Sequence, residues 1–108
     1  MNIMHVMAGA KQGGAETIFL ESVLALQDSP AEKNIQQFVV TRPHNEFRLS
    51  SLGASGIGVA TAPFNKWLKG PTEQVIERSI ASFQPDIIQY WMGRAGTFAQ
   101  KGSHVNVA

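Results

Sequence analysis

The sequence predicts an α/β fold in which a parallel β-sheet carries helices on both faces. Short apolar segments alternate along the chain with longer segments whose apolar residues recur at the spacing of a helix. Glycine and proline residues mark the boundaries between these segments. Strands that alternate with helices pair in parallel, and sheets of this kind bind ligands at the carboxyl ends of their strands.

The first half of the chain predicts three strands and two helices. An apolar strand at residues 2–7 enters a glycine-rich loop, and a helix at 15–27 follows because Phe19, Val23 and Leu26 share one face. The other elements of this half are a strand at 35–40, a short helix capped by Asn45 and ended by Gly53 and Gly56, and a strand at 57–60.

In the second half, two proline residues delimit a helix. Pro71 suits a first helical turn because its missing N–H would have no partner there, and Pro85 cannot continue the helix. The residues between them place apolar side chains on one face: Val75, Ile76, Ile80 and Phe83. After this helix we expect a strand at 86–90, a short helix at about 93–101 and, at 105–108, the start of a fifth strand.

Composition excludes several classes of protein. The net charge of +1 gives no electrostatic case for nucleic acid. Because the chain has no cysteine, it has no disulfide, thiolate nucleophile or cysteine zinc site, which fits a reducing compartment. No apolar run approaches the ~20 residues that span a bilayer, and the N-terminus lacks the basic region of a signal peptide. We therefore expect a single cytoplasmic domain.

The glycine-rich loop at residues 8–14 is the strongest local signal. A helix N-terminus offers unpaired N–H groups and a partial positive charge, and glycines let an anion approach them; the alternative is a tight turn that needs glycine only for its dihedral angles. Ala15 and Glu16 stand where a P-loop needs Lys and Ser/Thr. Lys11 replaces the middle glycine of a dinucleotide fingerprint, and Arg42 stands where that motif needs an acid. Kinase-type ATP hydrolysis and NAD binding are therefore disfavoured.

Two longer segments carry more specific patterns. Residues 3–16 read IMHVMAGAKQGGAE, which is a strand, Ala-Gly, a short loop and Gly-Gly-Ala-Glu at a helix start. Residues 84–95 read QPDIIQYWMGRA, a Pro-Asp turn into an apolar strand and then a small-residue helix with an arginine near its start. In form and in separation, the two segments resemble the N-terminal domain of family 4 glycosyltransferases. The resemblance covers essentially the whole chain.

This resemblance implies a GT-B fold, of which residues 1–108 would form part of the Rossmann-like N-terminal, acceptor-side domain, truncated at the start of the fifth strand. The enzyme would be a retaining glycosyltransferase, usually metal-free, that moves a sugar from a nucleotide diphosphate-sugar donor to a hydroxyl of a carbohydrate or glycolipid acceptor. Cell-surface polysaccharide or lipopolysaccharide synthesis is the implied setting, in the cytoplasm or peripherally at the inner face of the membrane. The donor is a substrate, and no further cofactor is implied.

The resemblance also suggests roles for individual residues. Backbone N–H groups of Gly13 and Gly14 would contact the donor diphosphate. Trp91 and Arg94 are acceptor-side candidates: Trp91, or Tyr90 before it, would stack on a sugar ring or pack on a helix, and Arg94 would meet an anion or lie on the surface. No catalytic residue or metal ligand is assigned, because the donor-binding C-terminal domain is missing. The chain alone is therefore expected to be inactive and, with an interdomain face bare, prone to self-association.

Two aromatic and three histidine side chains complete the set of candidates. Phe64 and Trp67 are expected to pack beneath the loop after the third strand, with an acceptor pocket or a membrane contact as the alternatives. His5 lies inside the first strand and is expected in the core. His44 and His104 have no evident partner in the sequence, so none of the three histidines is assigned a catalytic role.

Two other functions stay open at this point. Another GT-B enzyme, such as a nucleotide-sugar 2-epimerase, would share both the fold and the diphosphate contact. A non-catalytic truncated binding module would keep the fold without the chemistry.

Overall fold

The computed structural model describes residues 1–8, 14–28, 34–43, 46–65, 67–91, 102 and 104–107. Along the chain the elements are β1 (Asn2–Met7), α1 (Gly14–Asp28), β2 (Gln36–Thr41), α2 (Glu46–Ala54), β3 (Gly58–Thr61), α3 (Gly70–Phe83), β4 (Ile87–Trp91) and β5 (Val105–Val107). This alternation of strands and helices confirms the predicted order. The helix predicted at about 93–101 lies outside the described residues.

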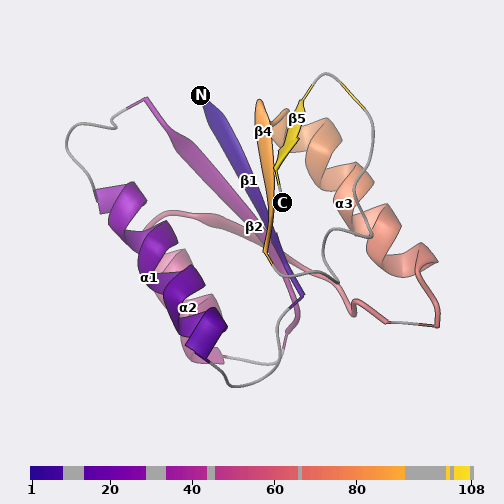
Figure 1. The fold of residues 1–108 in the computed structure, drawn as a ribbon, viewed down its shortest axis with the longest axis horizontal. Helices are drawn as coiled ribbons and strands as arrows, with labels where there is room; N and C mark the ends of the chain where they lie inside the picture. Colours follow the sequence, from indigo (N-terminus) through magenta and orange to yellow (C-terminus); the bar gives the residue numbers. More distant parts are fainter. Residues whose placement is uncertain are drawn as a thin grey trace.

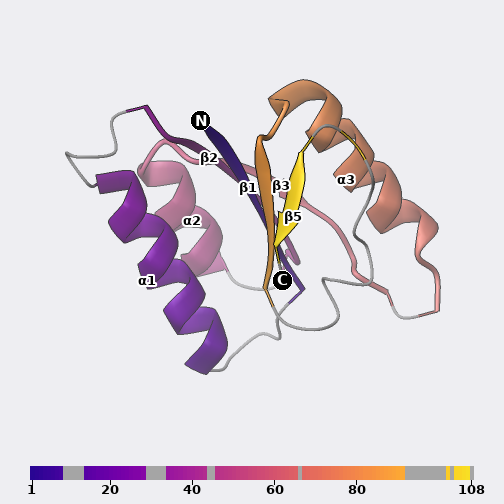
Figure 2. The same cartoon turned by 45° about the horizontal axis from the view of Figure 1, so that its top comes forward.

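The five strands form one parallel sheet in the order β3-β2-β1-β4-β5. Helices α1 and α2 lie side by side on one face of this sheet, and α3 lies on the other, as Figures 1 and 2 show from two directions. The predicted fold class is therefore confirmed as a Rossmann-like α/β arrangement. Among the described residues, no helix combines the length and the apolar character needed to cross a bilayer.

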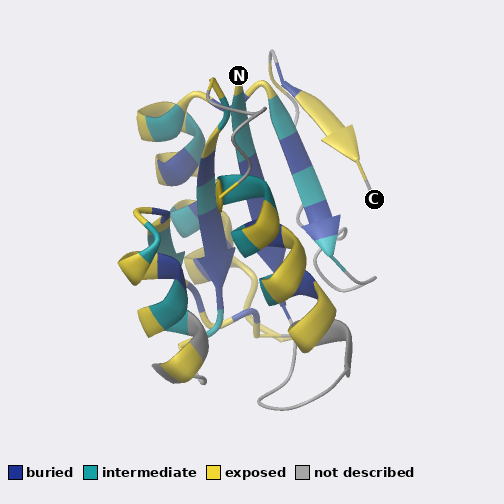
Figure 3. Ribbon diagram, turned by 90° about the vertical axis from the view of Figure 1, so that its left-hand side faces the viewer, coloured by how far each residue is buried: buried dark blue, intermediate teal, exposed yellow. Residues whose placement is uncertain are grey.

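Both faces of the sheet are buried against helices, which is what parallel strands require. Alternate residues of β1 serve the two sides: Met4 and Val6 enter the core beneath α3, while Met7 enters the core beneath α1 and α2. Ile76 of α3 and Phe19 of α1 are fully buried at the centres of these two cores. Figure 3 shows the contrast with β5, whose described residues are all exposed at one edge of the sheet.

The end of α2 is set by a glycine, as the sequence indicated. Gly56 has a φ of 80°, and its N–H donates to the carbonyl of Gly53 at 3.1 Å. The N–H of Ile57 donates to the carbonyl of Leu52 at 3.1 Å, and the two side chains share one core cluster. This is a Schellman motif with its usual apolar contact. The cap predicted at Asn45 lies outside the described residues.

The same motif explains an error of one residue in β3. The apolar character of Ile57 predicts a strand residue, but its N–H closes the end of α2, so the strand begins at Gly58. The strands predicted at 35–40 and 86–90 are likewise one residue too early, because pairing extends to Thr41 and Trp91, both opposite Met7.

Helix α3 has the boundaries that its prolines predicted. Pro71 lies in the first turn, and Lys69 is the N-cap residue. The helix ends at Phe83, and the C-cap residue Gln84 adopts the left-handed conformation with a φ of 52° and donates its N–H to the carbonyl of Ile80 at 2.9 Å. Pro85 follows directly, so the chain leaves the helix and enters β4.

Candidate functional site

The site that the topology defines is the carboxyl end of β1 and β4. The chain leaves β1 toward β2 and β3 on one side, and β4 and β5 lie on the other, so the strand order reverses between β1 and β4. Parallel sheets bind their ligands at such a switch point, because the two connections diverge there and leave a crevice. Met7 and Trp91 are opposite each other in the register of the two strands. The glycine loop follows Met7 and Ala8, and residues 92–94 follow Trp91, so both segments begin at this point.

Of the two donor-side residues, the structure describes the backbone of Gly14. Gly14 is the first residue of α1, so the helix begins one residue before the predicted start at residue 15. Its N–H belongs to the first turn, whose N–H groups have no partner within the helix. Gly13 and the acceptor-side candidate Arg94 lie outside the described residues.

The other acceptor-side candidate, Trp91, packs on a helix. Its ring is partly buried and meets the ring of Phe19 edge-on, with centroids 5.2 Å apart and planes at 77°. Tyr90 points to the opposite face of the sheet, where it is buried and its hydroxyl donates to Oδ1 of Asn106 at 3.0 Å. The packing interpretation of Trp91 thus describes its contacts, and stacking on a sugar stays a prediction.

Beneath Trp91 lies the buried imidazole of His5, whose protonation state is fixed by its partners. The indole N–H of Trp91 donates to Nδ1 of His5 at 3.1 Å, so Nδ1 carries no proton. The proton is therefore on Nε2, which lies 2.9 Å from Oε1 of Gln37 and donates to it. Burial lowers the pKa of His5, and the hydrogen bond to Gln37 acts in the opposite direction to a lesser extent. The prediction that His5 is a core residue is confirmed.

The polar chain continues from the sheet into the helical layer. The amide of Gln37 donates to the carbonyl of Val23 at 3.0 Å and to Oε1 of Gln27 at 3.2 Å. The amide of Gln27 in turn donates to the carbonyl of Ser55, at the end of α2, at 3.2 Å. Sequence analysis missed both glutamines; the only available signal was a polar residue inside the apolar strand β2.

A second set of contacts joins the ends of β2 and β3. Arg42, directly after β2, donates from Nε to the carbonyl of Pro63 at 3.3 Å and from Nη2 to the carbonyl of Phe64 at 3.1 Å. Phe64 is fully buried, has a φ of 50°, and donates its N–H to Oγ1 of Thr72 at 2.9 Å. Phe64 therefore packs beneath its loop as predicted. The same prediction is wrong for Trp67, which is 87% exposed, because Phe64 already fills the space beneath the loop.

At the amino ends of the strands, away from the candidate site, a hollow of about 570 Å³ lies beside β4. His104, for which the sequence offered no partner, is almost fully buried in its wall. The hollow is lined by Ile80, Ala81, Gln84, Pro85, Asp86, Gly102 and His104. It lies away from the switch point and is not part of the candidate site. His44 lies outside the described residues.

Comparisons of this chain with family models, with curated proteins and with solved structures gave no match. The class that the structure itself defines is a Rossmann-like α/β sheet whose switch point lies between the ends of β1 and β4.

Proposed function

We propose that this chain is the acceptor-side part of a retaining GT-B glycosyltransferase, which moves a sugar from a nucleotide diphosphate-sugar to an acceptor hydroxyl. The observation that carries the proposal is the register of β1 and β4. Because Met7 lies opposite Trp91, the strands of the two segments that resemble family 4 glycosyltransferases end side by side at the carboxyl edge of the sheet. A crevice there suits a ligand held by both segments.

On the donor side, the chemistry needs positive potential where the diphosphate leaves. Charge grows on the diphosphate as its bond to the sugar breaks, and fixed N–H dipoles stabilise that charge without reorganising. Helix α1 begins at Gly14 and directs its unpaired N–H groups and partial positive charge toward this point. The connection at residues 8–13 adds Lys11 and contains no acidic residue.

On the acceptor side, Trp91 and Arg94 would position a carbohydrate or glycolipid, in cell-surface polysaccharide or lipopolysaccharide synthesis. A C-terminal domain would supply most of the donor contacts and the residues of catalysis. We place the enzyme in the cytoplasm, because nucleotide-sugar donors are found in that compartment. An immunoblot of the source cells should then show a product several times larger than 11.7 kDa, while the 108-residue chain alone transfers no sugar.

The direct test is a titration of the ¹⁵N-labelled chain with nucleoside diphosphates, followed by NMR. We expect the amide signals of Gly13 and Gly14 and the indole signal of Trp91 to shift with UDP, GDP or ADP, and to shift less with the monophosphates. Shifts elsewhere on the chain, or no shift at millimolar nucleotide, would refute the proposal. Equal or tighter binding of NADH would point to a dinucleotide enzyme.

A matched pair of variants sharpens this test. Gly14→Pro removes one backbone N–H at a position where helices accept proline, while Gly14→Ala keeps the N–H. A hydrogen bond to a charged group contributes about 1.5–3 kcal/mol, so Gly14→Pro should weaken diphosphate binding by about tenfold or more. Gly14→Ala should bind like the wild type. Release of free nucleotide from a donor by the full-length enzyme, without acceptor, would favour the 2-epimerase over the transferase.

A further inference from the structure

We propose that the connection between β3 and α3 docks this protein on an anionic lipid surface. Trp67 and Leu68 would enter the headgroup region, and the neighbouring lysines would contact lipid phosphates. The inference goes beyond sugar transfer and does not depend on it, because it uses a different connection of the sheet from the one proposed for the donor.

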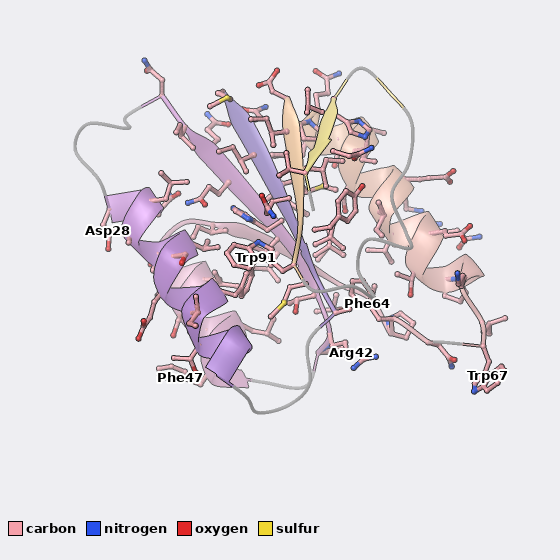
Figure 4. The ribbon with its side chains drawn as sticks, viewed as in Figure 1. Asp28, Arg42, Phe47, Phe64, Trp67 and Trp91 are labelled. Atoms are coloured by element: carbon pink, nitrogen blue, oxygen red, sulfur yellow. The ribbon has the colours of Figure 1, made fainter. Side chains whose placement is uncertain are left out.

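The apolar side chains of this connection are exposed. Trp67 is 87% exposed and Leu68 is 62% exposed, whereas Trp91 is partly buried and packs on Phe19 of α1. Figure 4 shows Trp67 at an outer corner of the molecule, pointing away from both helical layers. An amphipathic indole beside an aliphatic residue and lysines is the composition that proteins use at a membrane–water interface. A projecting tip of this kind suits a deformable headgroup layer.

The tip is presented by a structured support. The buried ring of Phe64 anchors the start of the connection, and its backbone is held by Thr72 on one side and Arg42 on the other. Closer to the tip, the N–H of Trp67 donates to Oδ1 of Asn65 at 2.8 Å. At the far end, Lys69 is the N-cap of α3, and its carbonyl accepts the N–H of Glu73 at 3.0 Å. The exposure of the indole is thus a property of the folded loop.

The connections at the carboxyl ends of the strands carry basic residues, which an anionic lipid surface attracts. Three connections follow the carboxyl ends of β1, β2 and β3, at residues 8–13, 42–45 and 62–69. Together they contain four basic residues and no acidic one: Lys11, Arg42, Lys66 and Lys69. The whole chain has nine basic and eight acidic residues, so the rest has five basic and eight acidic. The connections themselves are therefore positive although the protein is nearly neutral, while Glu16, Glu46 and Glu73 lie in the first turns of the helices that follow them. Anionic lipids attract the basic side chains of these connections.

Vesicle binding tests the proposal, with Trp67 as its own reporter. The chain has two tryptophans, so Trp91→Phe leaves Trp67 as the only indole, and circular dichroism checks that this variant stays folded. With phosphatidylcholine vesicles containing one-third phosphatidylglycerol, we expect the Trp67 emission to move to shorter wavelength and to be quenched by lipids brominated near the headgroup. Vesicles of pure phosphatidylcholine should cause a much smaller change.

Sedimentation with the same vesicles separates the contributions of apolar and charged residues in the wild-type background. The double variant Trp67→Ser, Leu68→Ser should lower partitioning at least tenfold, because two apolar side chains no longer leave water. Lys69→Gln should lower it about fivefold. Two variants serve as matched controls. Val105→Thr replaces a residue with 61% exposure on the edge strand β5, and Arg78→Gln removes an exposed charge in the middle of α3. Both variants should partition like the wild type.

Three results would overturn the proposal. The folded chain would fail to sediment with anionic vesicles, or it would bind neutral vesicles equally well, or the double variant would bind as tightly as the wild type. If instead the chain self-associated in solution and the double variant abolished that association without any vesicle binding, the surface would belong to a second copy of this chain.

Discussion

Acidification should destabilise this fold through one buried imidazole. Burial lowers the pKa of His5 below its ordinary value of 6.5, so the folded protein takes up this proton at lower pH than the unfolded chain does. Between the two pKa values the unfolded state binds more protons, and the free energy of unfolding therefore falls as the pH falls. The contribution is fully present above pH 6.5 and is lost as the pH drops toward the folded pKa.

The size of the effect follows from linkage and from the contacts of the ring. One proton changes stability by at most about 1.4 kcal/mol per pH unit, so the loss between pH 6.5 and 5 is at most about 2 kcal/mol. That is a large share of the roughly 5–15 kcal/mol that a domain has. Protonated Nδ1 would face the N–H of Trp91, which now donates to it. The described partners of the ring, Gln37, Trp91 and Phe19, include no carboxylate to stabilise the cation.

Urea denaturation from pH 7.5 to pH 4.5 measures this effect. The matched control is His5→Gln, which does not titrate and keeps an amide able to accept from Trp91 and donate to Gln37. The wild type should lose stability more steeply than the control below pH 6.5, and the difference should be flat above it. Parallel curves for the two proteins would refute the reasoning, as would an NMR titration that puts the pKa of His5 at or above 6.5.

Three further substitutions test the turns and the sheet by urea denaturation. Gly56→Ala should cost about 1 kcal/mol because a φ of 80° disfavours a Cβ, while open space around it adds no clash; no change would show that the turn relaxes. Gln84→Gly should have the opposite sign and gain up to about 1 kcal/mol, since Gln84 adopts the left-handed conformation at the end of α3. Gly58→Ala should cost about 1–3 kcal/mol, because its Cβ would lie 2.7 Å from the ring of Phe38, which packs on Phe83. A neutral Gly58→Ala would mean that the ring of Phe38 moves freely.

The fold was predictable because its signals are local. Apolar spacing defined α1 and α3, Pro71 defined a helix start, and Gly56 defined a helix end, each within a few residues of chain. The strand order was not predictable in this way. That β4 lies beside β1, with Trp91 opposite Met7, depends on packing between residues more than 80 positions apart. Sequence reasoning therefore found the strand ends that form the candidate site but not which two of them are neighbours.

The contacts between side chains of the site could not be predicted from the local sequence either. His5, Gln37 and Trp91 each had an ordinary interpretation alone, and only the folded sheet joins them in one hydrogen-bonded chain. The error at Trp67 has a similar origin. Phe64 and Trp67 are both aromatic residues of one loop, and which of them is buried was decided by the backbone at Phe64, held by Arg42 and Thr72.

Arg42 also limits where an anion can be bound at this edge. Its guanidinium is partly buried and donates to the carbonyls of Pro63 and Phe64, so its charge serves to hold the connection after β3. Lys69, the N-cap residue of α3, is exposed beside the projecting tip. The P-loop lysine is absent after Gly14, where Ala15 and Glu16 follow. A diphosphate at the switch point would therefore depend on the backbone N–H groups at the start of α1. Lys69 lies on a different connection, outside the crevice. This division gives the two proposals separate residues at one edge, so each can fail without the other.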